Sequence, residues 1–155
     1  SEDAHVLKIK QSKDYSTGGM AWKLVKSPAN FDSAAGINYT VDVTKPYGSR
    51  VTITGMADGR AFEMDKEYLA AITSYRSVGS GGLLKAAGLT DAKSVEDRIV
   101  YRGPEFRTIL YEYFKKYGSV DPAVIGDPEV IGSWKFVPDF APAAIKADVE
   151  LLYGK

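Results

Sequence analysis

The segment Ile37–Thr44 places the tightest constraint on the fold, because apolar and polar residues alternate along it without a break. Strict alternation is the pattern of a β-strand with one buried face and one solvated face. The residues on the apolar face are Ile37, Tyr39, Val41 and Val43. The fold must therefore contain a sheet whose apolar face is covered by other elements of the chain.

The chain after this strand is predicted to continue as an antiparallel meander. Val51–Ile53 resumes the alternation, and Asp58-Gly59 is a hairpin signal because both residue types tolerate a positive φ. Phe62 and Met64 would continue the next strand. The unbroken apolar run Tyr68–Thr73 predicts a strand buried on both faces. Weaker patterns predict further strands at Val6–Ile9, Met20–Leu24, Arg98–Tyr101, Val130–Ile131 and Trp134–Val137.

The best-marked helix is predicted to begin near Pro104 and to end at Gly118. Its apolar stripe, with spacings of three and four, consists of Phe106, Ile109, Leu110, Tyr113 and Phe114. Shorter helices are predicted at Gly82–Gly88 and Ala143–Leu152. Because strands and helices interleave without a repeated βαβ unit, the expected fold class is α+β, a mixed β-sheet flanked by helices.

Composition limits both the size and the chemistry. The 155 residues suit a single domain, 1–155, and the opening Ser1 suggests a fragment of a larger protein. Lys+Arg and Asp+Glu both number 20, so no excess of positive charge favours a nucleic-acid polymer as partner. Without cysteine, and with His5 as the single histidine, a thiolate zinc site is excluded and a Ser-His pair would need His5. No apolar run approaches the ~20 residues of a membrane span.

The loop from Ser74 to Gly82 is the candidate binding site. Its glycines remove side-chain bulk, so that a ligand can approach the backbone and find free N–H donors. Tyr75 offers a flat wall on which a nucleobase could stack. The candidate residues are Ser74, Tyr75, Arg76, Gly79, Ser80, Gly81 and Gly82. The alternative is an ordinary glycine-rich turn with a core tyrosine. Carboxylates are scattered singly, so no catalytic pair and no metal site are predicted.

Three stretches of the sequence carry a resemblance to a known family. They are Asn30-Phe31-Asp32, the strand segment Ala35–Pro46, and Ser74-Tyr75-Arg76 with the glycines that follow. In this order they resemble the C-terminal domain of bacterial 5'-nucleotidases and 2',3'-cyclic-nucleotide phosphodiesterases. The resemblance is strongest over residues 30–138.

The resemblance implies a division of labour between two domains. An N-terminal metallophosphoesterase domain, absent from this chain, would hold two divalent metals and cleave the phosphate ester. This chain would bind the nucleoside or nucleotide, with Tyr75 stacking the base, and would not be catalytic alone. A periplasmic or cell-surface location follows from the family only. Ser74 and Ser80 depart from the usual Asn and Gly, which leaves base preference open.

A second hypothesis is that the chain is a non-catalytic module that kept the fold and binds a small ligand or a partner protein. The departures at Ser74 and Ser80 motivate it. The sequence leaves open the phosphate position on the substrate, the oligomeric state, and whether the catalytic domain is fused or separate.

Overall fold

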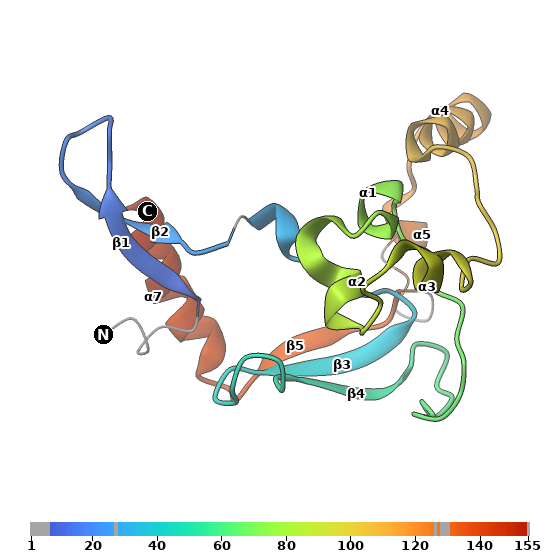
Figure 1. Cartoon of the computed structure of the whole chain (residues 1–155), viewed down its shortest axis with the longest axis horizontal. Helices are drawn as coiled ribbons and strands as arrows, with labels where there is room; N and C mark the ends of the chain where they lie inside the picture. Colours follow the sequence, from blue (N-terminus) through green and yellow to red (C-terminus); the bar gives the residue numbers. More distant parts are fainter. Residues whose placement is uncertain (1–6, 27, 126, 128–130, 155) are drawn as a thin grey trace. The chain divides into compact units, whose positions relative to one another are not determined.

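The computed structural model describes residues 7–26, 28–125, 127 and 131–154, so His5 and Val130 lie outside the described residues. The chain divides into two compact units, one formed by residues 1–63 and 126–155 and the other by residues 64–125. Each unit is described by itself. Along the described chain the elements run from strand β1 to helix α7 (Figure 1). They combine mixed sheets with helices, which confirms the α+β class.

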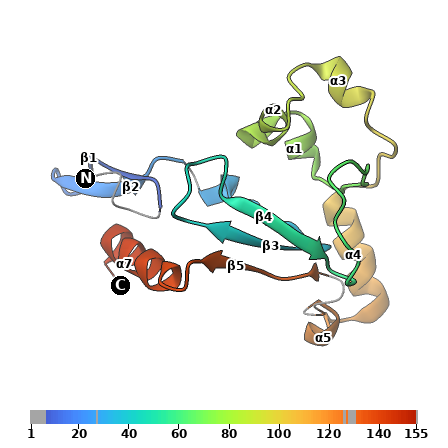
Figure 2. The same ribbon diagram turned by 90° about the horizontal axis from the view of Figure 1, so that it is seen from below.

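The sheet of the first unit has the strand order β4-β3-β5, with β3 in the centre (Figure 2). Strand β3 is Ile37–Asp42, β4 is Val51–Met56 and β5 is Trp134–Val137. Strand β4 pairs antiparallel to β3, whereas β5 pairs parallel to it. The predicted strands at these positions are confirmed. The strand with the clearest alternation of apolar and polar residues, β3, is the one that pairs on both sides.

Aromatic side chains gather on one face of this sheet. Tyr39 is buried, and the parallel register sets it opposite Trp134. Their rings stack with an interplanar angle of 7° and a centroid distance of 5.7 Å. Phe136 meets Trp134 edge to face at 5.2 Å, and Phe31 tilts against it at 6.0 Å. These contacts form the apolar face that the alternation predicted.

The start of β5 is held closely against β3 by backbone and amide contacts. The Asn38 side chain donates to Met56 O at 3.0 Å and accepts from the Ser133 amide at 2.7 Å, so it bridges the two outer strands. Gly132 has a φ of +73°, and a Cβ atom there would lie 2.8 Å from the Ile37 carbonyl carbon and closer still to its oxygen. Only glycine fits a backbone approach of this kind at a positive φ.

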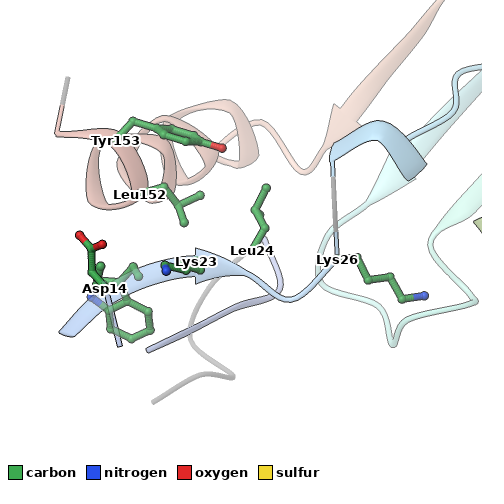
Figure 3. A pocket seen from close by; sticks show the side chains of 8 residues that line it. Asp14, Lys23, Leu24, Lys26, Leu152 and Tyr153 are labelled. Carbon is green, nitrogen blue, oxygen red and sulfur yellow. The ribbon is translucent and has the colours of Figure 1, made fainter. Parts of the chain in front are cut away.

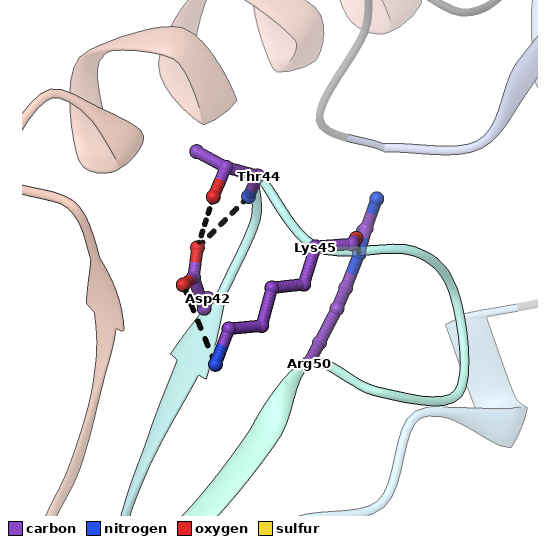
Figure 4. Close-up of polar contacts among 4 residues, drawn as sticks. All are labelled: Asp42, Thr44, Lys45 and Arg50. Carbon is purple, nitrogen blue, oxygen red and sulfur yellow. Dashed lines mark hydrogen bonds and ion pairs between the residues drawn. The ribbon is translucent and has the colours of Figure 1, made fainter.

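The turn between β3 and β4 is organised by one carboxylate (Figure 4). Asp42 accepts from the Thr44 hydroxyl at 2.6 Å and from the Thr44 amide at 3.0 Å. These hydrogen bonds, the hydroxyl first, lower the pKa of Asp42, and Lys45 lies 3.8 Å away as a weaker ion-pair partner. Arg50 Nε donates to Lys45 O across the loop at 2.9 Å. Hydrogen bonds to the ionised form thus stabilise the turn.

The first unit also contains a two-stranded antiparallel sheet, the 3-10 turn η2 (Pro28–Asn30) and helix α7. Strand β1, Ile9–Lys13, pairs with β2, Met20–Leu24, and α7, Ala141–Tyr153, contacts β2. The buried Asp148 of α7 accepts a hydrogen bond from the Leu7 amide at 3.0 Å. The prediction for Met20–Leu24 is confirmed. Of the strand predicted at Val6–Ile9, Val6 lies outside the described residues, Leu7 and Lys8 precede β1, and Ile9 begins it. Ile131, predicted in a strand, is helical.

The second unit consists of short helices and the longer helix α4. The helices are α1 (Ser74–Ser77), the 3-10 turn η3 (Ser80–Gly82), α2 (Leu83–Ala86), α3 (Ala92–Glu96), α4 (Phe106–Tyr117) and α5 (Pro122–Ile125). Helix α4 confirms the predicted helix and its glycine stop, since Gly118 follows it with a φ of +73°. The predicted stripe is not buried, because Phe106, Ile109, Leu110 and Phe114 are 40–65% exposed. Among the described residues no helix combines the length and apolar character that crossing a membrane requires.

Three predicted strands are wrong. Residues 60–73 contain no strand, so Phe62 and Met64 do not continue a hairpin, and Tyr68–Thr73 is exposed along its whole length. Thr73, the last residue of this run, instead forms the N-cap of α1, so the run ends where a helix begins. The segment Arg98–Tyr101 is not a strand either, because the Arg98 and Ile99 amides donate to carbonyls three residues back, at Val95 and Glu96. These two amides are used in local turns and are therefore not available for hydrogen bonds to a neighbouring strand.

Candidate functional site

The predicted loop begins as a single helical turn, α1, that presents Tyr75. The Thr73 hydroxyl accepts a hydrogen bond from the Arg76 amide, and the Ser77 hydroxyl donates to Ser74 O at 2.9 Å. These contacts fix the turn at both ends. Tyr75 is 57% exposed, so its ring is not packed into a core. A ring with an open face is what base stacking requires.

Arg76 braces the loop from inside. It is only 7% exposed, and its Nη1 donates to Ser80 O at 3.2 Å. Its guanidinium carbon lies 5.2 Å from the centroid of the Tyr75 ring, within the range of a cation–π contact. Arg76 therefore connects two other predicted site residues, because it contacts the ring of Tyr75 and donates to the carbonyl of Ser80.

The glycines give the loop its shape and do not all offer free amides. Gly79, Gly81 and Gly82 have φ values of +87°, +76° and +79°, in the left-handed region that favours glycine. The Gly79 amide donates to Arg76 O at 3.0 Å, and the Gly82 amide donates to Gly79 O at 3.2 Å. The expectation that these amides await a ligand thus fails for Gly79 and Gly82, because the tight turn uses them itself.

A hollow of about 360 Å³ opens beside this loop, within the second unit. Ser77, Val78 and Gly79 border it, and Tyr75 does not. The opposite wall comes from residues 89–102, which the sequence did not associate with the loop. The aliphatic residues of the lining, Leu84, Leu89, Val95 and Ile99, are separated by five, six and four positions. This spacing matches neither a helix nor a strand, so no periodic pattern in the sequence indicated the hollow.

The charged groups of this hollow are two carboxylates and one guanidinium. Asp91 caps α3 by accepting from the Ser94 amide at 2.9 Å, and this backbone hydrogen bond, followed by the contribution of the Ser94 side chain, lowers the pKa of Asp91. Glu96 forms an ion pair with Arg102, and both side chains are largely exposed. Asp91 is therefore engaged in holding the helix, whereas the Glu96–Arg102 pair lies open to solvent.

The first unit has a separate hollow of about 410 Å³ between β2 and α7 (Figure 3). Leu24 and Leu152 extend toward each other across it, whereas the Lys26 side chain points away. Asp14 lies at its edge, with the pKa lowered mainly by hydrogen bonds from the Ser16 hydroxyl and amide. None of the predicted site residues lines this hollow.

The described residues do not fit a metal centre. No group of three or more histidine, cysteine, aspartate or glutamate side chains comes together in this part of the chain. A site with two metal ions needs several such ligands around ions ~3.5–4 Å apart. No such donor set is available here to hold the divalent metals that the resemblance implies.

The chain is an α+β protein whose loop from Ser74 to Gly82 presents an exposed tyrosine beside glycines of positive φ. The family model of the 5'-nucleotidase C-terminal domain matches residues 5–88, more than half of the 155 residues. The chain belongs to this family.

One curated relative extends this comparison beyond the family model. The chain is 31% identical over 121 residues to a 2',3'-cyclic-nucleotide 2'-phosphodiesterase/3'-nucleotidase of Haemophilus influenzae. The match includes 70% of this chain and 17% of the length of that relative. The chain therefore corresponds to a minor part of that protein. No solved structure matches the chain.

Proposed function

We propose that this domain recognises the nucleoside part of a nucleotide for a phosphohydrolase whose catalytic centre lies in another domain. The observation that carries the proposal is the exposed ring of Tyr75, 57% accessible, in a member of the 5'-nucleotidase C-terminal domain family. Stacking of a base on an aromatic ring is worth ~1–3 kcal/mol and tolerates any base. Arg76 lies against the ring of Tyr75 and holds the turn through its hydrogen bond to Ser80 O.

The proposal assigns the phosphate chemistry to a partner domain. The chain spans 17% of a relative that is named as a phosphodiesterase and nucleotidase, and its described residues lack a metal-ligand cluster. We propose that a metallophosphoesterase domain, fused or separate, supplies two divalent metals and the hydrolytic step. The formal net charge of +0 fits a domain that binds the uncharged base and sugar. We also propose a periplasmic or cell-surface location, which cell fractionation would test.

Binding of adenosine to the full chain, measured by isothermal titration calorimetry, tests the role of Tyr75. Tyr75→Ala should weaken binding about 5- to 150-fold, the equivalent of one lost stack of ~1–3 kcal/mol. Tyr75→Phe keeps the ring and should bind as the unmodified chain does. A matched control is Tyr101→Ala, because Tyr101 is also an exposed tyrosine of the same unit, 78% accessible, and lies outside the candidate loop.

Unchanged adenosine binding in Tyr75→Ala would refute the stacking role. In that case the second hypothesis gains support, namely a module that kept the fold and binds a different small ligand or a partner protein. Release of phosphate from a nucleotide by the pure chain with added divalent metal would contradict the proposed division between domains.

A further inference from the structure

Helix α4 carries an apolar stripe that the rest of the described chain leaves open. Its exposed members, all 40–65% accessible, are Phe106, Ile109, Leu110, Phe114 and Tyr117. Large apolar side chains that recur every three or four positions normally face a core or a second helix. A continuous stripe of this kind in contact with solvent indicates an interaction surface.

One edge of the stripe carries charges of opposite sign at its two ends. Glu105 is the N-cap residue, and its carbonyl accepts from the Ile109 amide at 3.1 Å, so it lies in register with the helix. Lys116 follows eleven positions later, about three turns at ~3.6 residues per turn, and therefore lies on the same edge. Its Nζ is 4.8 Å from the centroid of the Tyr117 ring, which places the positive charge beside the stripe.

A second copy of α4 that runs antiparallel complements both edges. When a twofold axis perpendicular to the helices relates two copies, each edge of the stripe faces the same edge of the partner in reverse order. Glu105 then faces the partner's Lys116, and the reciprocal contact forms at the other end. On the opposite edge Arg107 faces the partner's Phe114, where a guanidinium can lie over the ring.

Both pairs of contacts place the twofold axis at the same point. The midpoint between Glu105 and Lys116 falls between Leu110 and Tyr111, and so does the midpoint between Arg107 and Phe114. Leu110, a member of the stripe, then packs against its own counterpart. The antiparallel order also brings the positive end of each helix dipole to the negative end of its partner.

We propose that α4 is a self-association surface, which joins two copies of this chain in an antiparallel helix pair centred between Leu110 and Tyr111. The occupant is a second copy because the charges along the edge complement themselves. The surface comprises about three helical turns, so the dimer forms and dissociates with concentration and is not obligate. The pairing does not depend on the proposed function of Tyr75.

Disulfide trapping in the full chain tests the arrangement directly, because the sequence contains no cysteine. In Leu110→Cys the two thiols lie across the twofold axis and should form a linked dimer under copper–phenanthroline oxidation. In Phe106→Cys they would lie about nine residues apart along the pair, ~13.5 Å at ~1.5 Å per residue, which exceeds the reach of a disulfide. Phe106 is more exposed than Leu110, 65% against 40%, so chance collisions would give the opposite result.

Sedimentation equilibrium tests the charge contacts. Lys116→Glu should weaken the dimer about 10-fold, because two attractive contacts become repulsive. The addition of Glu105→Lys to this variant should restore association, since the pairs form again with their signs exchanged. Lys115→Glu is the matched control, because it makes the same charge change on the helix face opposite the stripe and should leave association unchanged.

A chain that stays monomeric at every concentration would overturn the proposal, and the stripe would then serve a contact with another protein segment. Cross-linking of Phe106→Cys as readily as of Leu110→Cys would refute the antiparallel order. Equal effects of Lys115→Glu and Lys116→Glu, or no rescue by the exchanged pair, would contradict the assigned contacts. Each of these results leaves the proposed stacking on Tyr75 untouched.

Discussion

Replacement of Gly132 by alanine should destabilise the first unit more than the same replacement at another glycine of positive φ. Gly59 provides the comparison, since it has a φ of +85° and open space around its Cα, whereas Gly132 faces the backbone of Ile37. Alanine in the left-handed region costs ~1–2 kcal/mol at either site. At Gly132 the new methyl group also overlaps a carbonyl that cannot rotate away, which adds ~1–3 kcal/mol.

The free energy of unfolding should therefore fall by ~1–2 kcal/mol in Gly59→Ala and by ~2–5 kcal/mol in Gly132→Ala. Urea denaturation followed by tryptophan fluorescence measures both losses, and an unchanged slope m shows that the comparison is valid. Trp134, which follows Gly132 and stacks on Tyr39, lies in the affected strand.

Hydrogen exchange shows which part of the sheet is destabilised in Gly132→Ala. The Tyr39 and Val43 amides donate to Ser133 O and Val137 O, and both should lose protection in Gly132→Ala. Equal destabilisation by the two alanines would show that the close approach of Gly132 to Ile37 contributes nothing, and would refute the reasoning.

Two further predictions concern single polar side chains. The folded pKa of Asp42 is lowered, so its ionised form stabilises the fold above the ordinary pKa near 3.8, and this stability is lost as the pH falls through the lower folded value. Asp42→Asn should thus be destabilising at pH 6 and less so at pH 3 in urea titrations, and an equal loss at both would contradict the assignment. Arg76→Ala should cost ~1–3 kcal/mol and speed hydrogen exchange around Ser80, because the buried contact to Ser80 O is lost. Unchanged exchange in this loop would show that Arg76 is not its brace.

The elements that could be predicted from the sequence are those whose signals are local. Strand β3 has an alternating pattern, and helix α4 has a stripe with a terminal glycine, so each pattern matches one structure only. The run Tyr68–Thr73 has no alternation, and an apolar run of this length does not separate a buried strand from an exposed connection. Pairing depends on a neighbouring strand, which the run itself cannot specify.

The candidate site was predictable in its residue types but not in its geometry. The exposed ring of Tyr75 agrees with the composition of the loop. The inward orientation of Arg76 and the internal use of the Gly79 amide depend on the tight left-handed turn, whose hydrogen bonds no pattern of residue types specifies. The hollow was missed because its walls come from segments that are separated in sequence and meet only in the folded unit.

The parallel pairing of β3 with β5 also constrains how the protein is made. Asn38 and Ser133 are 95 positions apart, so β3 emerges from the ribosome long before the strand that completes its sheet. During synthesis only the hairpin with β4 can form early, and the other edge of β3 stays open until the late residues arrive. Closing so long a connection is slow compared with local hairpin formation. The nascent chain therefore presents an unpaired strand edge, to which other chains or chaperones can bind before β5 is synthesised.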